Sequence, residues 1–302
     1  MIEKIIQYPS KVVSLSNGIT IEIPKYSSLS NIASILEDKG LIQSKYYFII
    51  YSYFSGKAKA LKAGEYYFTK NTSQKNILNK LYKNDVKLYK LVVPECYSNK
   101  QIFEIIKNNL HIGVSKINYS EGSLFPSTYY YSKDTSADKL LSIMHDHANI
   151  HFLKLYNKYK HNISEALTQN EVLILASIVE AEAKIKEEQS KIARVFLNRL
   201  KKGMKLQADP TVIYGINKTV YLDRLLNKSD LLLDHEWNTY IINSLPPTPI
   251  CNVGIDAFKA VLNPEESNNL YFVADGKGGH LFSETYKEHK NKINLIKLNK
   301  IE

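Results

Sequence analysis

The sequence predicts an α+β fold, and three features of its pattern lead to that class. Two segments in the N-terminal third read as a short strand followed by an amphipathic helix. The middle of the chain, residues 137–201, has the apolar spacing of consecutive helices. A last strand pattern precedes a Gly-rich loop and a final helix near the C-terminus. We therefore expect a small α+β module followed by a mixed, helix-rich domain.

The two strand–helix segments share one pattern. Ile19–Pro24 and Tyr89–Pro94 both alternate apolar and polar residues and both end in proline. A serine, Ser28 or Ser98, then stands where it can cap the following helix. The sequence alone leaves open whether this is true structural repetition or a chance likeness between small α+β units.

The remaining elements are expected as follows. Helices are predicted near Lys45–Tyr53, Ser73–Leu81, Ala137–Lys160, Asn170–Lys186 and Glu188–Lys201, strands at Gly64–Phe68, Leu270–Ala274 and Leu281–Ser283, and a last helix from about Ser283 that carries Tyr286 and His289.

Length and composition limit the possible functions. The chain has 302 residues, 44% of them hydrophobic, which suits one large or two modest packed domains. Its net charge of +10 suggests an anionic partner: nucleic acid, an anionic membrane or an acidic polymer. Because the sequence has no helix-turn-helix, RNA-recognition or zinc-finger pattern, we expect no nucleic-acid partner.

The two cysteines and the N-terminal residues allow further predictions. Cys96 and Cys251 have neither CxxC nor metal-ligand spacing, so we expect no disulfide framework and no metal site. No run reaches the roughly 18 apolar residues that span a bilayer. Met1–Ser10 lacks a signal-peptide core, so the chain as given is expected to be soluble and without an export signal.

The strongest candidate for chemistry is a glutamate in a predicted helix. The pattern Thr168-x-x-Glu171 is that of a capping box and starts the helix. Leu173, Ala176 and Glu180 then follow at helical spacing, which predicts that Glu180 shares the core-facing side. Burial raises the pKa of a carboxyl group, and a glutamate with a raised pKa suits a general acid for glycosidic cleavage.

Alternatives to this interpretation stay open. Glu180 can instead end the buried stripe and reach solvent, or pair with Lys184 one helical turn on. Helical rotation points Glu182 elsewhere, so we expect it to be a solvated or supporting residue.

Two segments carry residues that suit sugar binding. Gly203–Gly215 includes Gln207 and Asp209, and Trp237–Tyr240 combines amide and aromatic groups. Planar hydrogen-bonding groups pair with hydroxyl and acetamido groups, and rings stack on pyranose faces. Ordinary turns explain both segments equally well. Gly276–His280 lacks the spacing of a phosphate-binding loop, so we interpret it as a turn that delivers His280 to a site.

Four blocks in this order resemble one known family. They are Ala176–Glu182, Val195–Leu200, Leu206–Val212 and Phe272–His280, with further likeness at Leu61–Tyr66 and Glu121–Tyr129. Together they are similar to the endolytic murein transglycosylase family, also called MltG or YceG-like. Each block alone is weak, but four in order are specific, and the resemblance covers nearly the whole chain.

The resemblance implies both an architecture and an activity. It implies a LysM-like peptidoglycan-binding module at 17–84 and a catalytic domain at 85–302 with its core at about 165–302. The implied enzyme is a lyase that cleaves the MurNAc–GlcNAc β-1,4 bond inside glycan strands without water and leaves 1,6-anhydroMurNAc ends. Glu180 matches the single acid/base, first protonating the glycosidic oxygen and then accepting the proton of the muramoyl C6 hydroxyl. The expected substrate-binding residues are Asn198, Gln207, Asp209, Asn238, Thr239, Tyr240 and His280.

The resemblance also implies partners and a location. No metal or organic cofactor is expected, and peptidoglycan synthases are possible partners. Family members are held in the inner membrane by an N-terminal helix and act on its outer side, but this chain shows no such anchor, and Cys96 stands where the family has Gly. Two alternatives stay open: a hydrolytic muramidase with Asp209 as the second carboxylate, and a non-catalytic peptidoglycan-binding scaffold.

Overall fold

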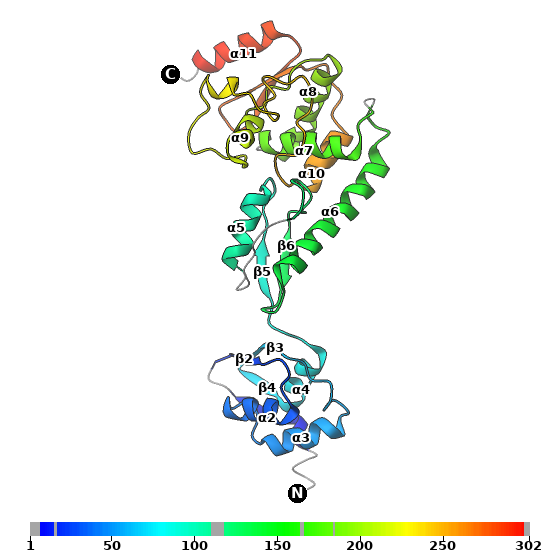
Figure 1. Cartoon of the computed structure of the whole chain (residues 1–302), viewed down its shortest axis with the longest axis vertical. Helices are drawn as coiled ribbons and strands as arrows, with labels where there is room; N and C mark the ends of the chain where they lie inside the picture. The colour runs from blue at the N-terminus through cyan, green and yellow to red at the C-terminus, as the bar shows by residue number, and fades with distance from the viewer. Residues whose placement is uncertain (1–6, 15–16, 110–117, 164–165, 184, 299–302) are drawn as a thin grey trace. The chain divides into compact units, whose positions relative to one another are not determined.

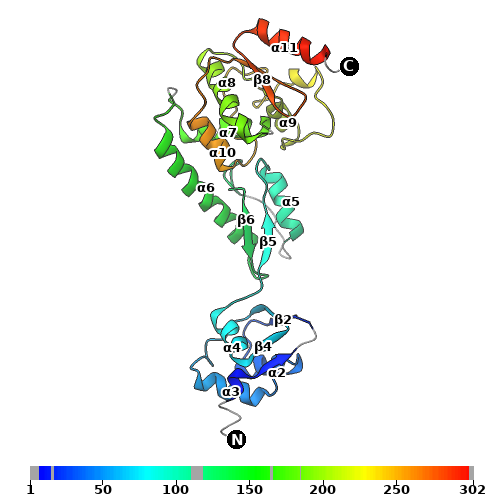
Figure 2. The ribbon, with the colours of Figure 1, turned by 180° about the vertical axis from the view of Figure 1, so that it is seen from behind.

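The computed structural model describes residues 7–14, 17–109, 118–163, 166–183 and 185–298 and confirms the α+β class. The chain forms two compact units, one made of residues 1–91 and 130–135 and the other of residues 92–129 and 136–302. Figures 1 and 2 show the helices and short strands of each unit from opposite sides. The LysM-like character of the N-terminal part stays a prediction.

The N-terminal unit packs helices and two small antiparallel sheets around one core. Its elements are β1 (Val12–Ser14), β2 (Ile19–Ile23), α2 (Leu29–Asp38), α3 (Lys45–Phe54), β3 (Gly64–Phe68), β4 (Asn71–Ser73) and α4 (Gln74–Lys83). The strand β2 pairs with β3, and β1 pairs with β4. Alternation along β2 buries Ile21 and Ile23, and β3 adds Tyr66 and Phe68 to the same core.

The second strand–helix segment has the predicted form. The strand β5 (Tyr89–Val92) is followed by α5 (Asn99–Asn109), and β5 pairs with β6 (Thr128–Tyr131). The Ser28 side chain accepts a hydrogen bond from the backbone N–H of Asn31, and Ser98 accepts one from Gln101. Both predicted segments therefore contain a strand, a serine-capped turn and a helix.

The C-terminal unit is built around one buried helix. It contains α6 (Ala137–Tyr159), α7 (Gln169–Glu182), α8 (Gln189–Lys201), α9 (Asp209–Asn217), α10 (Ile255–Leu262), β7 (Tyr271–Ala274), β8 (His280–Ser283) and α11 (Tyr286–Leu298). The helix α7 packs against α8, α9 and α10, and Figure 1 shows it between them. Residues 174–179 are all buried, so α7 has no solvent-facing side over this stretch.

The structure corrects the expectation that the two cysteines form no disulfide. Cys96 and Cys251 form a disulfide, with their Cα atoms 4.8 Å apart. The two residues are 155 positions apart in the chain, so their spacing carried no information about pairing. The fold joins their segments through the backbone N–H of Cys96, which donates to the carbonyl of Asn252 at 2.8 Å. Cys96 has a φ of 58°, the left-handed region that favours glycine.

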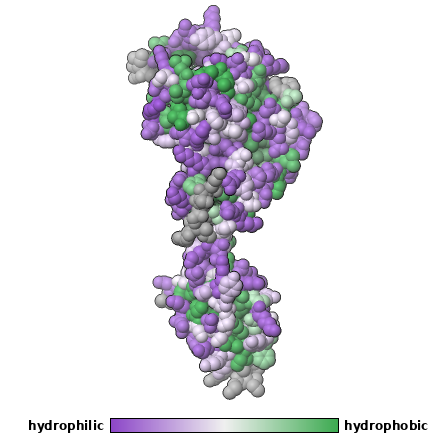
Figure 3. All heavy atoms as spheres, in the orientation of Figure 1, coloured by the Kyte–Doolittle hydropathy of each residue, from purple (hydrophilic) through white to green (hydrophobic). Residues whose placement is uncertain are grey.

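The surface mixes polar and apolar side chains. Figure 3 shows hydrophilic residues over much of the visible face, with small hydrophobic patches between them. Among the described residues, none of the helices combines the length and the apolar character needed to cross a membrane. The same residues contain no cluster of three or more His, Cys, Asp or Glu side chains suited to a metal ion.

Candidate active site

A pocket in the C-terminal unit gathers side chains that are far apart in the sequence. It has a volume of about 280 Å³. Its lining residues come from the end of α7, from α8, from the turn into α9, from β7, from α11 and from the loop before α10; they are Glu182, Arg199, Leu206, Gln207, Asp209, Tyr240, Phe272 and His289. Most of these side chains carry a polar group that can form hydrogen bonds with a ligand.

The helix α7 delivers Glu182 to this pocket. The predicted capping box is present: the backbone N–H of Glu171 donates to the Thr168 hydroxyl, and the Glu171 carboxylate accepts from the Thr168 backbone N–H at 2.7 Å. The helix ends at Glu182, because Ala183 takes an extended conformation. The last helical side chain is thus fixed by a helix that the core holds along most of its length.

Glu182 has the electrostatics of a general acid. Its side chain is partly buried. Burial, and to a lesser degree the negative charge of Asp209, raises the pKa of Glu182 to about 8, although the Asp209 backbone N–H and the Arg199 charge act in the opposite direction. The carboxyl group is therefore mostly protonated at pH 7, which allows it to donate a proton.

Asp209 and Tyr240 form a hydrogen-bonded pair at the pocket wall. The Tyr240 hydroxyl donates to the Asp209 carboxylate at 2.6 Å. Burial, together with this bond, raises the pKa of Tyr240, so the phenol stays neutral and keeps donating. The pair fixes the direction of the Asp209 carboxylate.

Gln207 is held in an unusual backbone conformation beside Asp209. Its φ of 51° lies in the left-handed region, which is uncommon for a residue other than glycine. Its backbone N–H donates to the carbonyl of Thr239 at 3.1 Å, and this bond helps to hold the turn. Such conformations often occur at binding sites.

Arg199 links two walls of the pocket. Its guanidinium is almost fully buried and donates to the carbonyls of Leu206 and Leu270, both at 2.7 Å. Burial lowers the pKa of Arg199, whereas the electrostatic interactions with Tyr271, Tyr240 and Glu182 raise it. Arg199 thus ties the segment before α9 to the start of β7.

The other predicted binding residues support the walls. Asn238 and Thr239 are fully buried. The Asn238 amide donates to two backbone carbonyls, and Thr239 accepts from the backbone N–H of Ala208 at 2.9 Å. The Asn198 amide donates to the carbonyls of Ser267 and Asn269.

His280 also has a supporting position. Its Nδ1 lies 2.7 Å from the carboxylate of Glu188, and its backbone N–H donates to the same carboxylate. The ring packs edge-on against Phe272, a pocket residue. Its contact with the pocket is therefore indirect.

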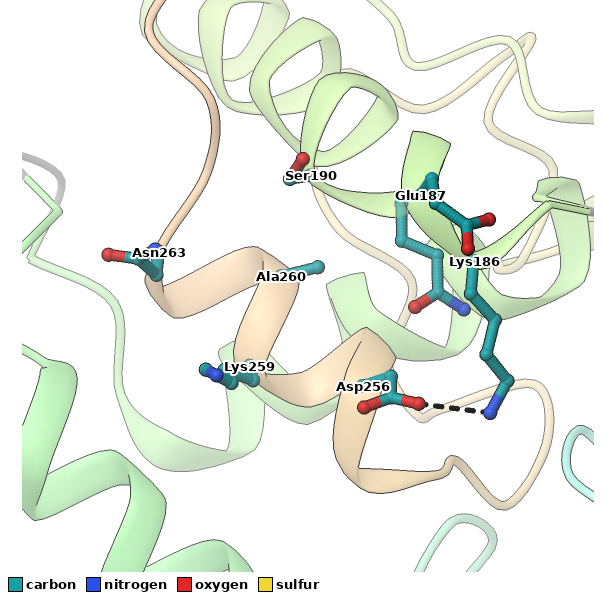
Figure 4. Close-up of a pocket in the computed structure, with 8 residues that line it drawn as sticks. Lys186, Glu187, Ser190, Asp256, Lys259, Ala260 and Asn263 are labelled. Carbon is teal, nitrogen blue, oxygen red and sulfur yellow. Dashed lines mark hydrogen bonds and ion pairs between the residues drawn. The ribbon is translucent and has the colours of Figure 1, made fainter.

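Glu180 lies in a different environment from Glu182. Its carboxylate accepts hydrogen bonds from the Gln189 amide at 3.1 Å and from the backbone N–H of Gly254 at 3.0 Å. Burial is the main cause of its raised pKa, and the negative charge of Glu95 adds to it. Gln189 also lines a second, open hollow of about 450 Å³, where Lys186 pairs with Asp256 at 2.9 Å (Figure 4).

Burial raises the pKa of Glu180, as its place in the helix pattern predicted, but the structure corrects the expected position of Glu182. Glu180 does not line the pocket that holds Gln207, Asp209 and Tyr240, whereas Glu182, expected to be solvated or supporting, does. The helix α7 has no single core-facing stripe, because it is buried on all sides before Glu180, and its apolar periodicity therefore does not reveal a functional face. Lys184, the possible partner of Glu180, lies outside the described residues.

Comparisons with known proteins agree with one another. The YceG-like family matches residues 21–295. A Bacillus subtilis (strain 168) protein named endolytic murein transglycosylase is 33% identical, covering 90% of this chain and 82% of the relative. A Streptococcus pneumoniae serotype 2 protein (strain D39) of the same name is 28% identical over 89% of this chain, which spans 56% of that relative's length.

A crystal structure supports the same relationship. It is of a YceG-like protein from Listeria monocytogenes, which is 32% identical to this chain. The match covers 91% of this chain and 99% of the Listeria chain, with a TM-score of 0.60. The sequence and structure comparisons together show that the chain belongs to the YceG-like family.

Proposed function

We propose that this chain is a peptidoglycan lytic transglycosylase. In this proposal it cleaves the MurNAc–GlcNAc β-1,4 bond inside glycan strands without water and leaves 1,6-anhydroMurNAc ends. The observation that carries the proposal is Glu182, a carboxyl group that burial keeps protonated at neutral pH in a pocket lined by amide, carboxylate and aromatic groups. The names of the curated relatives support the same activity.

Glu182 takes the role of the acid/base in place of Glu180. Both carboxyl groups have raised pKa values. Only Glu182 lines the pocket with Asp209, and both Glu180 oxygens accept bonds from neighbouring protein groups. A general acid must be within hydrogen-bond reach of the oxygen that it protonates. Our choice of Glu182 rests on its place in the pocket, and Glu180, which matches the family's acid/base, is the alternative.

One carboxyl group suffices because the substrate supplies the nucleophile. Protonated Glu182 donates its proton to the glycosidic oxygen as the C1–O bond breaks, and positive charge develops at C1 of the muramoyl sugar. The resulting carboxylate then removes the proton of the C6 hydroxyl, whose oxygen bonds to C1 and closes the anhydro ring. Glu182 ends protonated, and no water is consumed.

The neighbouring groups have separate tasks in this mechanism. The Asp209 carboxylate, fixed by Tyr240, places negative charge where the oxocarbenium-like transition state develops positive charge. The amide of Gln207 is positioned to bind polar groups of the sugar. Arg199 keeps the two walls together.

The alternative of a hydrolytic muramidase assigns Asp209 a second catalytic role. A hydrolase needs its second carboxylate to activate water or attack C1. Asp209 already accepts a short hydrogen bond from Tyr240, which suits a fixed charge better than a nucleophile. A third possibility, a non-catalytic scaffold, predicts glycan binding without turnover.

The experiment that separates these functions is product analysis. Purified protein is incubated with sacculi, and the muropeptides are analysed by mass spectrometry. Internal cleavage with 1,6-anhydroMurNAc ends supports the proposal. Reducing ends without anhydro sugar support a hydrolase, and unchanged sacculi with retained binding support a scaffold.

The place of action follows from the proposed substrate. We propose that the protein acts outside the cytoplasm at the inner membrane, near peptidoglycan synthases. The Cys96–Cys251 disulfide supports this placement, because structural disulfides persist mainly in oxidising compartments. We further propose that the part at 17–84 binds glycan as a LysM-like module.

A further inference from the structure

The helix α11 contributes one side chain to the pocket. His289 is half-buried and lines the pocket, while the residues around it on α11 face outward. Its ring stacks on Tyr271, with ring centres 5.2 Å apart and an interplanar angle of 23°. Tyr286 lies close to both rings. This aromatic contact sets the direction in which the imidazole enters the pocket.

The environment of the ring determines which nitrogen can bind a ligand. The Nδ1 atom of His289 is buried and has no hydrogen-bond partner among the described residues. A buried N–H without a partner is costlier than an unpaired acceptor, so we assign the lone pair to Nδ1 and the hydrogen to Nε2. Burial, Arg199 and Lys292 lower the pKa of His289, which keeps the ring neutral. The exposed edge of the ring therefore offers one neutral N–H donor.

We propose that His289 binds the substrate, donating a hydrogen bond from Nε2 to the acetamido carbonyl of an N-acetylated amino sugar in the pocket. The inference deepens the proposed function and rests on it. The Nε2 edge of the His289 ring can donate a hydrogen bond but cannot accept one. It therefore suits a ligand group that only accepts hydrogen bonds. The same pocket holds the carboxylate of Asp209, whose negative charge disfavours an anionic ligand. A neutral amide carbonyl meets both conditions.

Two variants separate binding from a structural role. His289→Phe keeps a ring that stacks on Tyr271 but removes the donor. His289→Gln removes the ring but places an amide N–H near the position of Nε2. Lys290→Ala, an exposed change on the same helix, is the control. Kinetics of anhydro-end release are measured on N-acetylated strands and on strands whose acetyl groups have been removed, with thermal melts alongside.

The binding role predicts a specific pattern. On acetylated strands, His289→Phe raises KM about fivefold, the size of one neutral hydrogen bond, with kcat within about twofold. His289→Gln and Lys290→Ala stay near wild type. On de-N-acetylated strands, His289→Phe and wild type have the same KM.

Opposite results overturn the inference. An unchanged KM for a folded His289→Phe, or a larger loss for His289→Gln than for His289→Phe, assigns the ring a structural role. If wild type releases no anhydro ends, the proposed function fails. Calorimetry with acetylated and deacetylated glycan oligomers then still tests His289, because equal affinities of wild type and His289→Phe for the acetylated oligomer would refute the contact.

Discussion

Replacement of Glu182 by glutamine separates its chemistry from its effect on stability. Glutamine keeps the size of the side chain but cannot donate a proton or act as a base. General acid–base catalysis typically supplies about a hundredfold to ten-thousandfold in rate. Since Glu182 serves both steps of the proposed reaction, we expect Glu182→Gln to lose at least that much in kcat for anhydro-muropeptide release.

The same change should stabilise the protein, and the pKa gives the size of the effect. The pKa of Glu182 rises from its ordinary value of 4.5 to about 8 on folding. The native state therefore binds more protons than the unfolded state between these values, and wild-type stability falls as pH rises through this window. The cost reaches at most about 1 kcal/mol at pH 5 and about 4 kcal/mol at pH 8. Glu182→Gln does not have this cost.

Urea unfolding at pH 5 and pH 8 measures this difference. We expect the stability gained by Glu182→Gln over wild type to grow by up to about 3 kcal/mol between the two pH values. A gain that is the same at both pH values refutes the assigned pKa. Near-wild-type product from well-folded Glu182→Gln refutes the mechanism.

Glu180→Gln is the matched control, because Glu180 lies two residues away on the same helix and also has a raised pKa. It should fold and keep appreciable activity. Complete loss of activity in a folded Glu180→Gln protein, with activity retained in Glu182→Gln, would return the acid/base role to Glu180.

Three further predictions follow from the same structure. Wild-type kcat should fall as pH rises through about 8, where Glu182 loses its proton. Because the charge of Asp209 raises the pKa of Glu182, this fall should occur at lower pH in Asp209→Asn. The pH–rate profiles of both proteins test this. The double variant Cys96→Ala/Cys251→Ala should lose about 2–4 kcal/mol of stability in urea unfolding, whereas an equal midpoint would show that the bond adds nothing. A truncated chain that starts at about Asp85 should lose affinity for sacculi in pull-down assays more than it loses cleavage of short soluble glycans; equal losses would make the N-terminal part structural.

Local patterns predicted the elements of the fold well, because strand alternation and helix capping act over a few residues. The strand Gly64–Phe68 has the expected limits, and Thr168 begins α7 as its capping box indicated. The pairing of Cys96 with Cys251 was not predictable. It depends on how segments far apart in the chain pack together, and no local pattern records that.

The sequence predicted only some of the residues that line the pocket, because the pocket also depends on long-range packing. Gln207, Asp209 and Tyr240 were recognised as candidates because their chemistry suits sugars, and they line one pocket. Arg199 and His289 were missed as lining residues. Arg199 lies in a block that resembles the family, which was the one available signal, but only the tertiary fold shows that it and α11 reach the same pocket.

The choice between Glu180 and Glu182 shows how helix ends tune an acid. Glu182 is the last residue of α7, where the helix dipole disfavours negative charge, and it meets the first residue of α9, whose backbone N–H favours it. These two influences oppose each other, so burial and the charge of Asp209 decide the outcome. The resulting pKa near 8 lets one group give up a proton and recover it at neutral pH. Helix periodicity describes which side of a helix is buried, but this balance depends on what the end of the helix meets.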